Sequence, residues 1–478
     1  MARSAQAPGG EGPPPRRSRP PKAPTPAAKD APPEKTTSAE PARRTRPPRS
    51  RRPGRRETAP ETDDDTPKYE VSDMPAEGAE LAPPKPRRRE PSTTNLVRHA
   101  VPLDEQSIDP DVARVVRRLI RAGHDAYLVG GCVRDLLLGR SPKDFDVATS
   151  ARPEDVRALF RNSRIIGRRF RLVHVLFANR KVIEVATFRR NPKPGDEDAT
   201  DEELLIRSDN AFGTIEEDAI RRDFTINALF YDVEGREILD FTDGMPDIRR
   251  RAVRTIGDPA TRFKEDPVRI LRAVKFAGKL DLGIDPDVVD AMVSTREQLR
   301  LAAKPRLFEE VLRLMRGGAS RRSIFLAWDT GMLHVLLPEL ASMMDDVGEG
   351  DAPASRVFRL LAELDHRTEQ KGEPFDDVVL WTLLLLEPLL EACEGERDRI
   401  GAAIAFCDPI LERLSVPRRI ADSMRRIVAV LPRLHAGKLG RFARNELFDQ
   451  AVAVAEMRLA AIGDRDAVAR LRKALGES

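Results

Sequence analysis

The sequence predicts an α+β protein, in which a small sheet-and-helix head is followed by an all-helical neck and body and preceded by a disordered tail. About half of the 39 prolines fall in a charged N-terminal segment. Short β-rich runs then alternate with helical runs, and apolar residues recur at helical spacing from there to the end. The expected parts are a tail over 1–95, a head over 96–245, a neck over 246–345 and a body over 346–478.

The tail is expected to stay unfolded because its charges come in blocks. Residues 1–56 hold 15 Lys and Arg against 4 Asp and Glu, whereas 57–83 hold 1 against 9. Blocks of like charge without apolar periodicity remain solvated. Two roles stay open: the basic stretches could attract RNA phosphates or protein partners, or the tail could be a linker without a specific partner.

The composition excludes a membrane span and a disulfide or zinc framework. Charged residues make up 33% of the chain, and the longest apolar run, 381–390, is interrupted by Glu387 and Pro388, short of the roughly 20 residues that a span needs. The N-terminus has no apolar segment typical of a cleaved secretory signal, so a cytoplasmic location is expected. The three cysteines form no CxxC and are expected to be reduced structural thiols: Cys132, Cys393 and Cys407.

The head is expected to open with a helix, DPDVARVVRRLIRAG, which Gly123 closes. A strand AYLVGG, a helix CVRDLLLG, a loop RSPK and a strand DFDVAT follow. A further helix is expected after a Ser150 cap. The runs RLVHVLFA and KVIEVATF, joined at Asn179 and Arg180, predict a hairpin.

The remainder is expected to be helical and shows no repeat of fixed period. Apolar spacing predicts helices over EEDAIRRDFTINALFYD and DPVRILRAVKFAGKL. Further helices are expected over 305–317, 322–340, 355–370, 376–393, 399–413, 417–435 and 440–475.

Asp144 and Asp146 are the first candidates for chemistry. In a strand, a period of two places both carboxylates on one face. Such oxygen ligands suit Mg²⁺, and two ions about 3.5–4 Å apart can support an in-line phosphoryl displacement. Glu184, flanked by apolar residues, is a candidate third metal ligand, with a solvent-facing position as the alternative.

An isolated DxD more often marks an exposed turn, but a glycine pair lies just upstream. Gly130 and Gly131 are expected where a strand meets a helix, so their amides could approach a triphosphate. Arg134, one turn further on, could reach the same anion. This combination favours a nucleotide site over a tight turn with surface charges.

Two later motifs could complete such a site. On the expected helix over EEDAIRRDFTINALF, Arg222 suits phosphate oxygens, while Asp223 and Asn227, four residues apart, suit ribose hydroxyls. Asp266 and Arg269 at i and i+3 could present an acceptor and a donor to a base. The alternatives are a solvated helix face and an ordinary salt bridge.

Together these motifs resemble those of the class II tRNA nucleotidyltransferase and bacterial poly(A) polymerase family, over roughly 108–345. The resemblance implies that GGCVRDLLLGRSPKDFDVAT binds metal and triphosphate, that RRDFTINAL binds ribose and that EDPVR selects the base. It implies two Mg²⁺ ions, ATP as substrate and RNA 3′ ends as partner. The implied catalytic residues are Asp144, Asp146 and Asp223, and the implied nucleotide-binding residues are Gly130, Gly131, Arg134, Arg222, Asn227, Asp266 and Arg269.

Three segments resemble the poly(A) polymerases more than the CCA-adding enzymes: 165–175, 209–232 and 304–315. They favour addition of AMP to RNA 3′ ends, and the alternatives are CCA addition to tRNA and RNA binding by an inactive head. Phosphate contact by Arg168, Arg169 or Arg171 is open beside plain surface charge, and His174 is expected to be structural. The basic segment departs from the family by preceding the head, whereas these polymerases often carry one at the C-terminus.

Overall fold

The computed structural model describes residues 96–167, 171–191, 211–348 and 352–476. The expected disordered tail therefore lies outside the described residues, as do Arg168 and Arg169. Among the described residues, no helix combines the length and the apolar character that a membrane span needs.

The head is built on one eight-stranded sheet with the order β1-β8-β7-β2-β3-β6-β5-β4. β3 and β6 run parallel, and the other neighbouring pairs are antiparallel. The expected hairpin is β5 with β6, so that prediction is confirmed. The strands are β1 (Val97–His99), β2 (Ala126–Val129), β3 (Asp146–Thr149), β4 (Ser163–Ile166), β5 (Leu172–Leu176), β6 (Val182–Thr187), β7 (Leu229–Asp232) and β8 (Glu237–Asp240).

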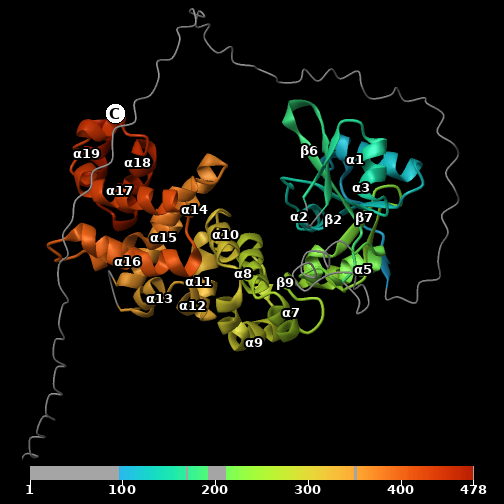
Figure 1. Cartoon of the computed structure of the whole chain (residues 1–478), viewed down its shortest axis with the longest axis horizontal. Helices are drawn as coiled ribbons and strands as arrows, with labels where there is room; N and C mark the ends of the chain where they lie inside the picture. The colour runs from blue at the N-terminus through green and yellow to red at the C-terminus, as the bar shows by residue number, and fades with distance from the viewer. Residues whose placement is uncertain (1–95, 168–170, 192–210, 349–351, 477–478) are drawn as a thin grey trace, which may run out of the picture. The chain divides into compact units, whose positions relative to one another are not determined.

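Helices α1 (Pro110–Arg121), α2 (Gly131–Leu137) and α3 (Pro153–Leu159) pack on this sheet (Figure 1). The Asp109 carboxylate caps α1 by accepting the Asp111 amide at 2.9 Å. The predicted Ser150 cap of α3 is wrong, because the helix begins at Pro153 and the Ser150 hydroxyl accepts the Asp125 amide instead.

The long helix predicted over 216–232 is also wrong. Only α5 (Ile215–Ile220) is an α-helix; a 3₁₀ turn, η5 (Thr225–Asn227), follows, and the chain then enters β7. All four residues of β7 are buried, because Phe230 faces one apolar cluster while Leu229 and Tyr231 face the other. A strand buried on both faces has no polar alternation, so its apolar run resembles a helix segment.

The neck is helical apart from two short paired strands that the sequence did not predict. β9 (Ala252–Val253) pairs in parallel with β10 (Gly283–Ile284). The described helical elements around them are α6 (Gly244–Arg250), α7 (Pro259–Glu265), α8 (Val268–Leu280), α9 (Pro286–Thr295), η6 (Arg296–Leu301) and α10 (Lys304–Met315).

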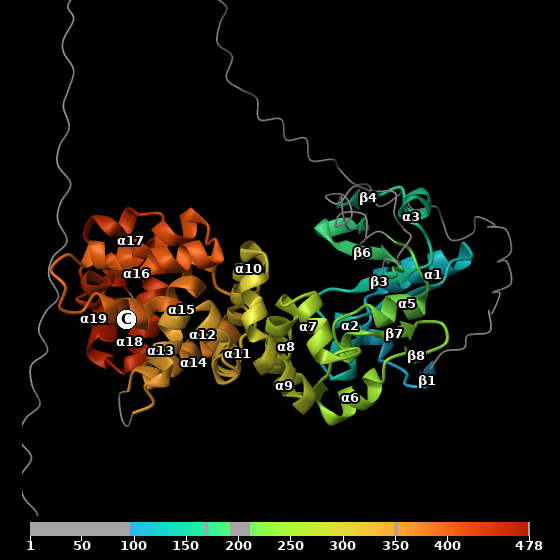
Figure 2. The same ribbon diagram turned by 60° about the horizontal axis from the view of Figure 1, so that its bottom comes forward.

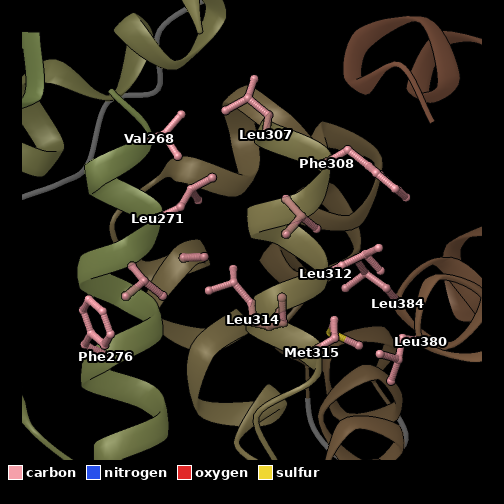
Figure 3. Packing of buried hydrophobic residues seen from close by; sticks show 14 of the residues in the cluster. Val268, Leu271, Phe276, Leu307, Phe308, Leu312, Leu314, Met315, Leu380 and Leu384 are labelled. Atoms are coloured by element: carbon pink, nitrogen blue, oxygen red, sulfur yellow. The ribbon is translucent and has the colours of Figure 1, made fainter. Parts of the chain in front are cut away.

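Apolar side chains join the neck helices to the body in a continuous core. In Figure 3, Val268 and Leu271 of α8 lie toward α10, whereas Leu312 and Met315 of α10 lie toward α15 (Asp377–Ala392). All four are at most 1% exposed. Burial of such side chains stabilises a fold by about 1.5–3 kcal/mol each, so these layers fix the position of α8.

The rest of the neck and the body are helical as expected, but two of the predicted helices are divided. Gly331, at a φ of 76°, and Pro338 break the predicted helix 322–340 into three, and Gly463, at 73°, separates two helices within 440–475. Figure 2 shows α16 beside α17. The neck ends with α11 (Ser320–Asp329), α12 (Met332–Leu336) and α13 (Pro338–Asp345). The described helical elements of the body other than α15 are α14 (Pro353–Lys371), α16 (Arg399–Leu414), α17 (Arg418–His435), η7 (Gly440–Arg444), α18 (Phe448–Ile462) and α19 (Arg465–Leu475).

Candidate nucleotide site

The acidic residues gather where β3 begins. Asp146 is the first residue of β3, and the parallel register places it beside Glu184 of β6. Asp144 lies in the loop before the strand, so the prediction that both aspartates share a strand face is wrong. Burial and the charges of Glu184 and Asp144 raise the pKa of Asp146, and Arg222 partly opposes them.

Oxygen donors crowded in this way fit a divalent cation, which would relieve the repulsion between carboxylates. Although the surrounding protein desolvates Asp146, its side chain and that of Asp144 keep surface accessible to solvent, so both could reach such an ion. Glu184 is 48% exposed at the side chain, and its Oε1 lies 3.2 Å from His174 Nε2, which gives His174 the structural partner that was expected. Among the described residues, no three His, Cys, Asp or Glu side chains already form a metal-binding group.

A glycine turn joins β2 to α2, as the sequence predicted. Gly130 has a φ of 76°, which favours glycine, and an added Cβ would lie 3.2 Å from Nη1 of Arg222. The Gly130 amide donates to the Leu229 carbonyl at 3.4 Å. Of the two amides expected to approach a triphosphate, the Gly131 amide therefore remains the better candidate.

Arg134 points into the protein. Its Nη1 donates to Asn227 Oδ1 at 2.6 Å, its Nη2 donates to Asp135, and its guanidinium lies 5.0 Å from the centre of the Phe276 ring. With 8% of its side chain exposed, Arg134 orients Asn227 in this structure. A triphosphate contact by Arg134 stays a prediction.

Arg222 is held over the glycine turn by Asp218, a residue that the sequence analysis missed. Arg222 Nη2 lies 2.8 Å from Asp218 Oδ2, and Arg222 Nη1 donates to the Asn227 carbonyl at 3.3 Å. Although burial opposes ionisation, Arg222 and Arg221 hold the pKa of Asp218 below its usual value. Asp218 precedes Arg222 by four residues, a spacing that could have indicated the pair.

Asp223 and Asn227 are close together, although they share no α-helix. Asn227 Nδ2 donates to Asp223 Oδ1 at 3.1 Å, because the 3₁₀ turn brings the two side chains together. Arg272 of α8 donates from Nε to Asp223 Oδ2 at 2.7 Å. Burial raises the pKa of Asp223, but Arg272, Asn227 and the Phe224 amide together lower it below its usual value.

Asp266 and Arg269, both in the described part of the chain, do not lie on one helix, and the salt bridge between them that was the alternative to base selection does not form. Their role in base selection stays a prediction. Asp266 is the residue just after α7, at its C-cap, and accepts a hydrogen bond from Arg306 Nη2 at 2.8 Å. Arg269 lies in α8 and donates to Glu265 at 2.9 Å. Pro267 separates the two helices because it lacks the amide that a continuous helix would use.

Two further residues connect these motifs. Arg262 Nη2 donates to the Arg222 carbonyl at 2.6 Å, and its own carbonyl accepts from Arg269 at 3.0 Å. Arg272 follows Arg269 by one helical turn, a spacing that could have indicated a shared face. The hydrogen-bond network therefore runs from Asp218 and Arg222, beside the glycine turn, to the neck helices α7 and α8.

Comparison with known proteins gives consistent matches. A family model described as "Poly A polymerase head domain" matches residues 126–254, and one described as "Probable RNA and SrmB- binding site of polymerase A" matches 281–344. Poly(A) polymerase I of Escherichia coli O6:H1 is 39% identical over 352 residues, which cover 70% of this chain and 75% of that protein.

CCA-adding enzymes are similar as well. The enzyme of Geobacillus stearothermophilus is 39% identical over 227 residues, which cover 48% of this chain and 54% of that protein. The crystal structure of the Bacillus stearothermophilus CCA-adding enzyme in complex with CTP has a TM-score of 0.57 and 28% identity, and the match covers 77% of this chain and 83% of that one.

Proposed function

Because the chain belongs to the family of bacterial poly(A) polymerases and CCA-adding enzymes, and is therefore a nucleotidyltransferase, we propose that it adds AMP from ATP to RNA 3′ ends. The observation that carries this proposal is the extent of the match. Similarity to Poly(A) polymerase I of E. coli continues over 70% of the chain at 39% identity. At the same identity, the match to the CCA-adding enzyme of G. stearothermophilus covers 48%.

In the proposed reaction, the RNA 3′-hydroxyl oxygen forms a bond to the α-phosphorus of ATP. The bond between the α-phosphorus and the bridging oxygen breaks, pyrophosphate leaves, and the hydroxyl proton passes to solvent. Two Mg²⁺ ions, when bound, would supply Lewis-acid activation and charge neutralisation. Asp144 and Asp146 would hold them, with Glu184 as a third carboxylate if it releases His174.

The remaining residues would bind and orient ATP. Arg222 contributes positive charge beside the Gly130 turn, and the neighbouring Gly131 amide can donate to a phosphate oxygen. Asp223 and Asn227 are assigned to the ribose, and their mutual hydrogen bond keeps them at one place. Asp266 and Arg269 are proposed to select adenine, which requires each to exchange a present partner for the base.

CCA addition to tRNA is the second candidate, because the same residues could serve CTP and then ATP. It is favoured by a CCA-adding enzyme of Lactobacillus delbrueckii that is 33% identical over 330 residues, covering 69% of this chain.

The basic tail over 1–95 is proposed to add electrostatic RNA contacts. Its deletion should weaken RNA binding and flatten the salt dependence.

Extension assays with the full chain and magnesium separate these functions. A short RNA and a tRNA lacking its CCA end are each incubated with ATP, with CTP and with both. A long ladder from ATP alone on the short RNA supports AMP addition. Arrest after two or three nucleotides, with a requirement for CTP, would establish CCA addition instead, and no extension with any mixture would leave only RNA binding.

Asp144→Ala serves as the catalytic control in this assay, and it should abolish extension while RNA binding persists. The matched control is Asp290→Ala, since Asp290 is an exposed aspartate on α9. It should extend RNA at the wild-type rate. Extension by Asp144→Ala at that rate would refute the metal assignment.

A further inference from the structure

The contact between Asp223 and Arg272 joins the head to the neck at the proposed ribose site. Arg272 Nε donates to Asp223 Oδ2 at 2.7 Å, and Nη2 of the same guanidinium lies 2.5 Å from that oxygen. The Asp223 side chain is 11% exposed and the Arg272 side chain 31%. A contact this close and this sheltered from water restricts both groups to one arrangement.

The hydrogen bonds of Asp223 leave capacity for one more donor. Oδ1 accepts two, from the Phe224 amide at 2.9 Å and from Asn227 Nδ2 at 3.1 Å. Oδ2 accepts from Arg272 Nε and also contacts Nη2, and because both nitrogens belong to one guanidinium they approach Oδ2 from the same side. An ionised carboxylate offers about four acceptor positions. The position that remains lies on Oδ2, the oxygen that Arg272 fixes, and a hydroxyl group is a suitable donor for it.

Arg272 is itself held from several sides. Its guanidinium lies 5.6 Å from the centre of the Phe276 ring, and that ring contacts Phe224, the neighbour of Asp223, edge-on at 5.6 Å. Phe276 is 9% exposed, and its helix α8 is fixed by the apolar packing against α10 described above. The direction of Oδ2 is therefore set by a neck helix and not by the head alone.

From this geometry we propose that Arg272 is a positioning residue that aims the remaining acceptor of Asp223 Oδ2 at a ribose hydroxyl, and so determines selection of ribonucleotides over 2′-deoxyribonucleotides. The inference depends on the proposed assignment of Asp223 to the ribose. It adds that sugar selection requires a side chain of the neck. Arg272 acts through Asp223 and need not touch the nucleotide.

A purely structural role for Arg272 makes a different prediction. If the ion pair only joined the head to the neck, its loss would weaken binding of every nucleotide by the same factor. If Arg272 positions the ribose acceptor, its loss weakens the binding of ATP and leaves that of 2′-deoxyATP nearly unchanged. The ratio of the two affinities therefore separates the roles.

Calorimetric titration of the full chain with ATP and with 2′-deoxyATP, in magnesium and without RNA, measures this ratio. In Arg272→Met, which keeps an apolar stem and removes the charge, the preference for ATP should fall about tenfold, as expected for a hydrogen bond to a charged group. Arg272→Lys restores the charge without the planar guanidinium, so its ratio should lie between those of Arg272→Met and the wild type.

Arg250→Met is the matched control. Arg250 also forms ion pairs, within the neck: its Nε donates to Asp247 of the same helix at 2.9 Å, and its Nη2 donates to Asp285 at 2.8 Å. Among the described residues, these hydrogen bonds go to Asp247 and Asp285 and not to Asp223. The sugar preference of Arg250→Met should equal that of the wild type.

Three results would overturn the inference: a wild type that does not prefer ATP over 2′-deoxyATP, an unchanged ratio in Arg272→Met, or a raised ratio, which would mean that Arg272 competes with the ribose. Should Arg272→Met fail to fold, an unchanged ratio in Arg272→Lys decides against the proposal. The titrations contain no RNA and measure nucleotide binding alone. A failure of the proposed AMP addition would therefore appear in the extension assay and not in the titrations. The CTP and 2′-deoxyCTP pair should show the same loss of sugar preference.

Discussion

Asp146 and Asp223 are both assigned to the proposed nucleotide site, but their surroundings are opposite. Asp146 begins β3 beside Glu184 and near Asp144, and burial together with these charges raises its pKa. Asp223 is enclosed by donors, and Arg272 with the other donors lowers its pKa despite burial. Around Asp146 the negative charges outweigh Arg222, so a bound cation would relieve the excess, whereas Asp223 already has Arg272 as its counterion.

The difference indicates that Asp146 is available to bind a cation, whereas Asp223 is held in a fixed position by its neighbours. Carboxylates crowded without a counterion are costly and occur where function requires them. A carboxylate with a nearby guanidinium stabilises the fold as long as both partners remain. Substitution at the two positions should therefore separate activity from stability.

The largest expected effect is the loss of activity in Asp146→Asn. The amide removes one charge from the acidic cluster, so RNA extension should fall on the order of 10³-fold, since a metal ion contributes several kcal/mol to such a transition state. The free energy of unfolding should stay within about 0.5 kcal/mol of the wild-type value, because the substitution also removes the repulsion between Asp146 and Glu184. Extension rates and urea denaturation measure the two effects, and a large loss of stability would contradict the comparison.

Asp223→Asn should reduce the stability of the fold much more than Asp146→Asn does. It leaves the partly buried Arg272 without its counterion, so we expect a loss of about 2 kcal/mol in the free energy of unfolding, after allowance for the exposure of Arg272. Urea denaturation measures this loss. A variant as stable as Asp146→Asn would show that the ion pair contributes nothing.

Glu184→Gln tests how far the acidic cluster extends along the sheet. Since Glu184 is half exposed and contacts His174, the amide should leave stability nearly unchanged. If Glu184 is a third metal ligand, the magnesium concentration for half-maximal extension should rise about tenfold, which corresponds to about 1.4 kcal/mol. An unchanged magnesium requirement would limit the metal site to Asp144 and Asp146.

The smallest effect concerns pH. The folded-state pKa of Asp223 is below its ordinary value of 3.8, so the unfolded chain binds the proton more readily. The contribution of Asp223 is therefore complete above that ordinary value and lost as the pH falls through the lowered pKa. The stability difference between the wild type and Asp223→Asn should be constant from pH 7 to about 4.5 and narrow below pH 4, and a difference that widens with acid would refute this assignment.

Sequence patterns predicted most of the head correctly where one face of an element is polar. The amphipathic α1, the glycine turn at Gly130 and the β5–β6 hairpin lie where they were expected. β7 was misjudged because it is buried on both faces, so its apolar residues carry no period of two. Asp144 was placed in a strand that begins two residues later.

In the candidate site, too, some features were predictable from the sequence and others were not. The order and the residue types of the motifs were sufficient to indicate a nucleotidyltransferase, because close backbone approach needs glycine and cations need carboxylates. The partners were not predictable: Arg272 lies 49 positions from Asp223, and Arg306 lies 40 from Asp266.

The sequence by itself determined the chemical inventory of this protein, since acids, glycines and arginines at fixed spacing define which groups could bind metal, phosphate and sugar. Only the tertiary structure decided that burial and neighbouring acids outweigh Arg222 around Asp146, whereas Arg272 and the other donors outweigh burial around Asp223. The physical reason is that charge interactions depend on distance and burial in space. The packing of α8 against the head sets these distances and this burial. The spacing of residues along the sequence does not encode that packing.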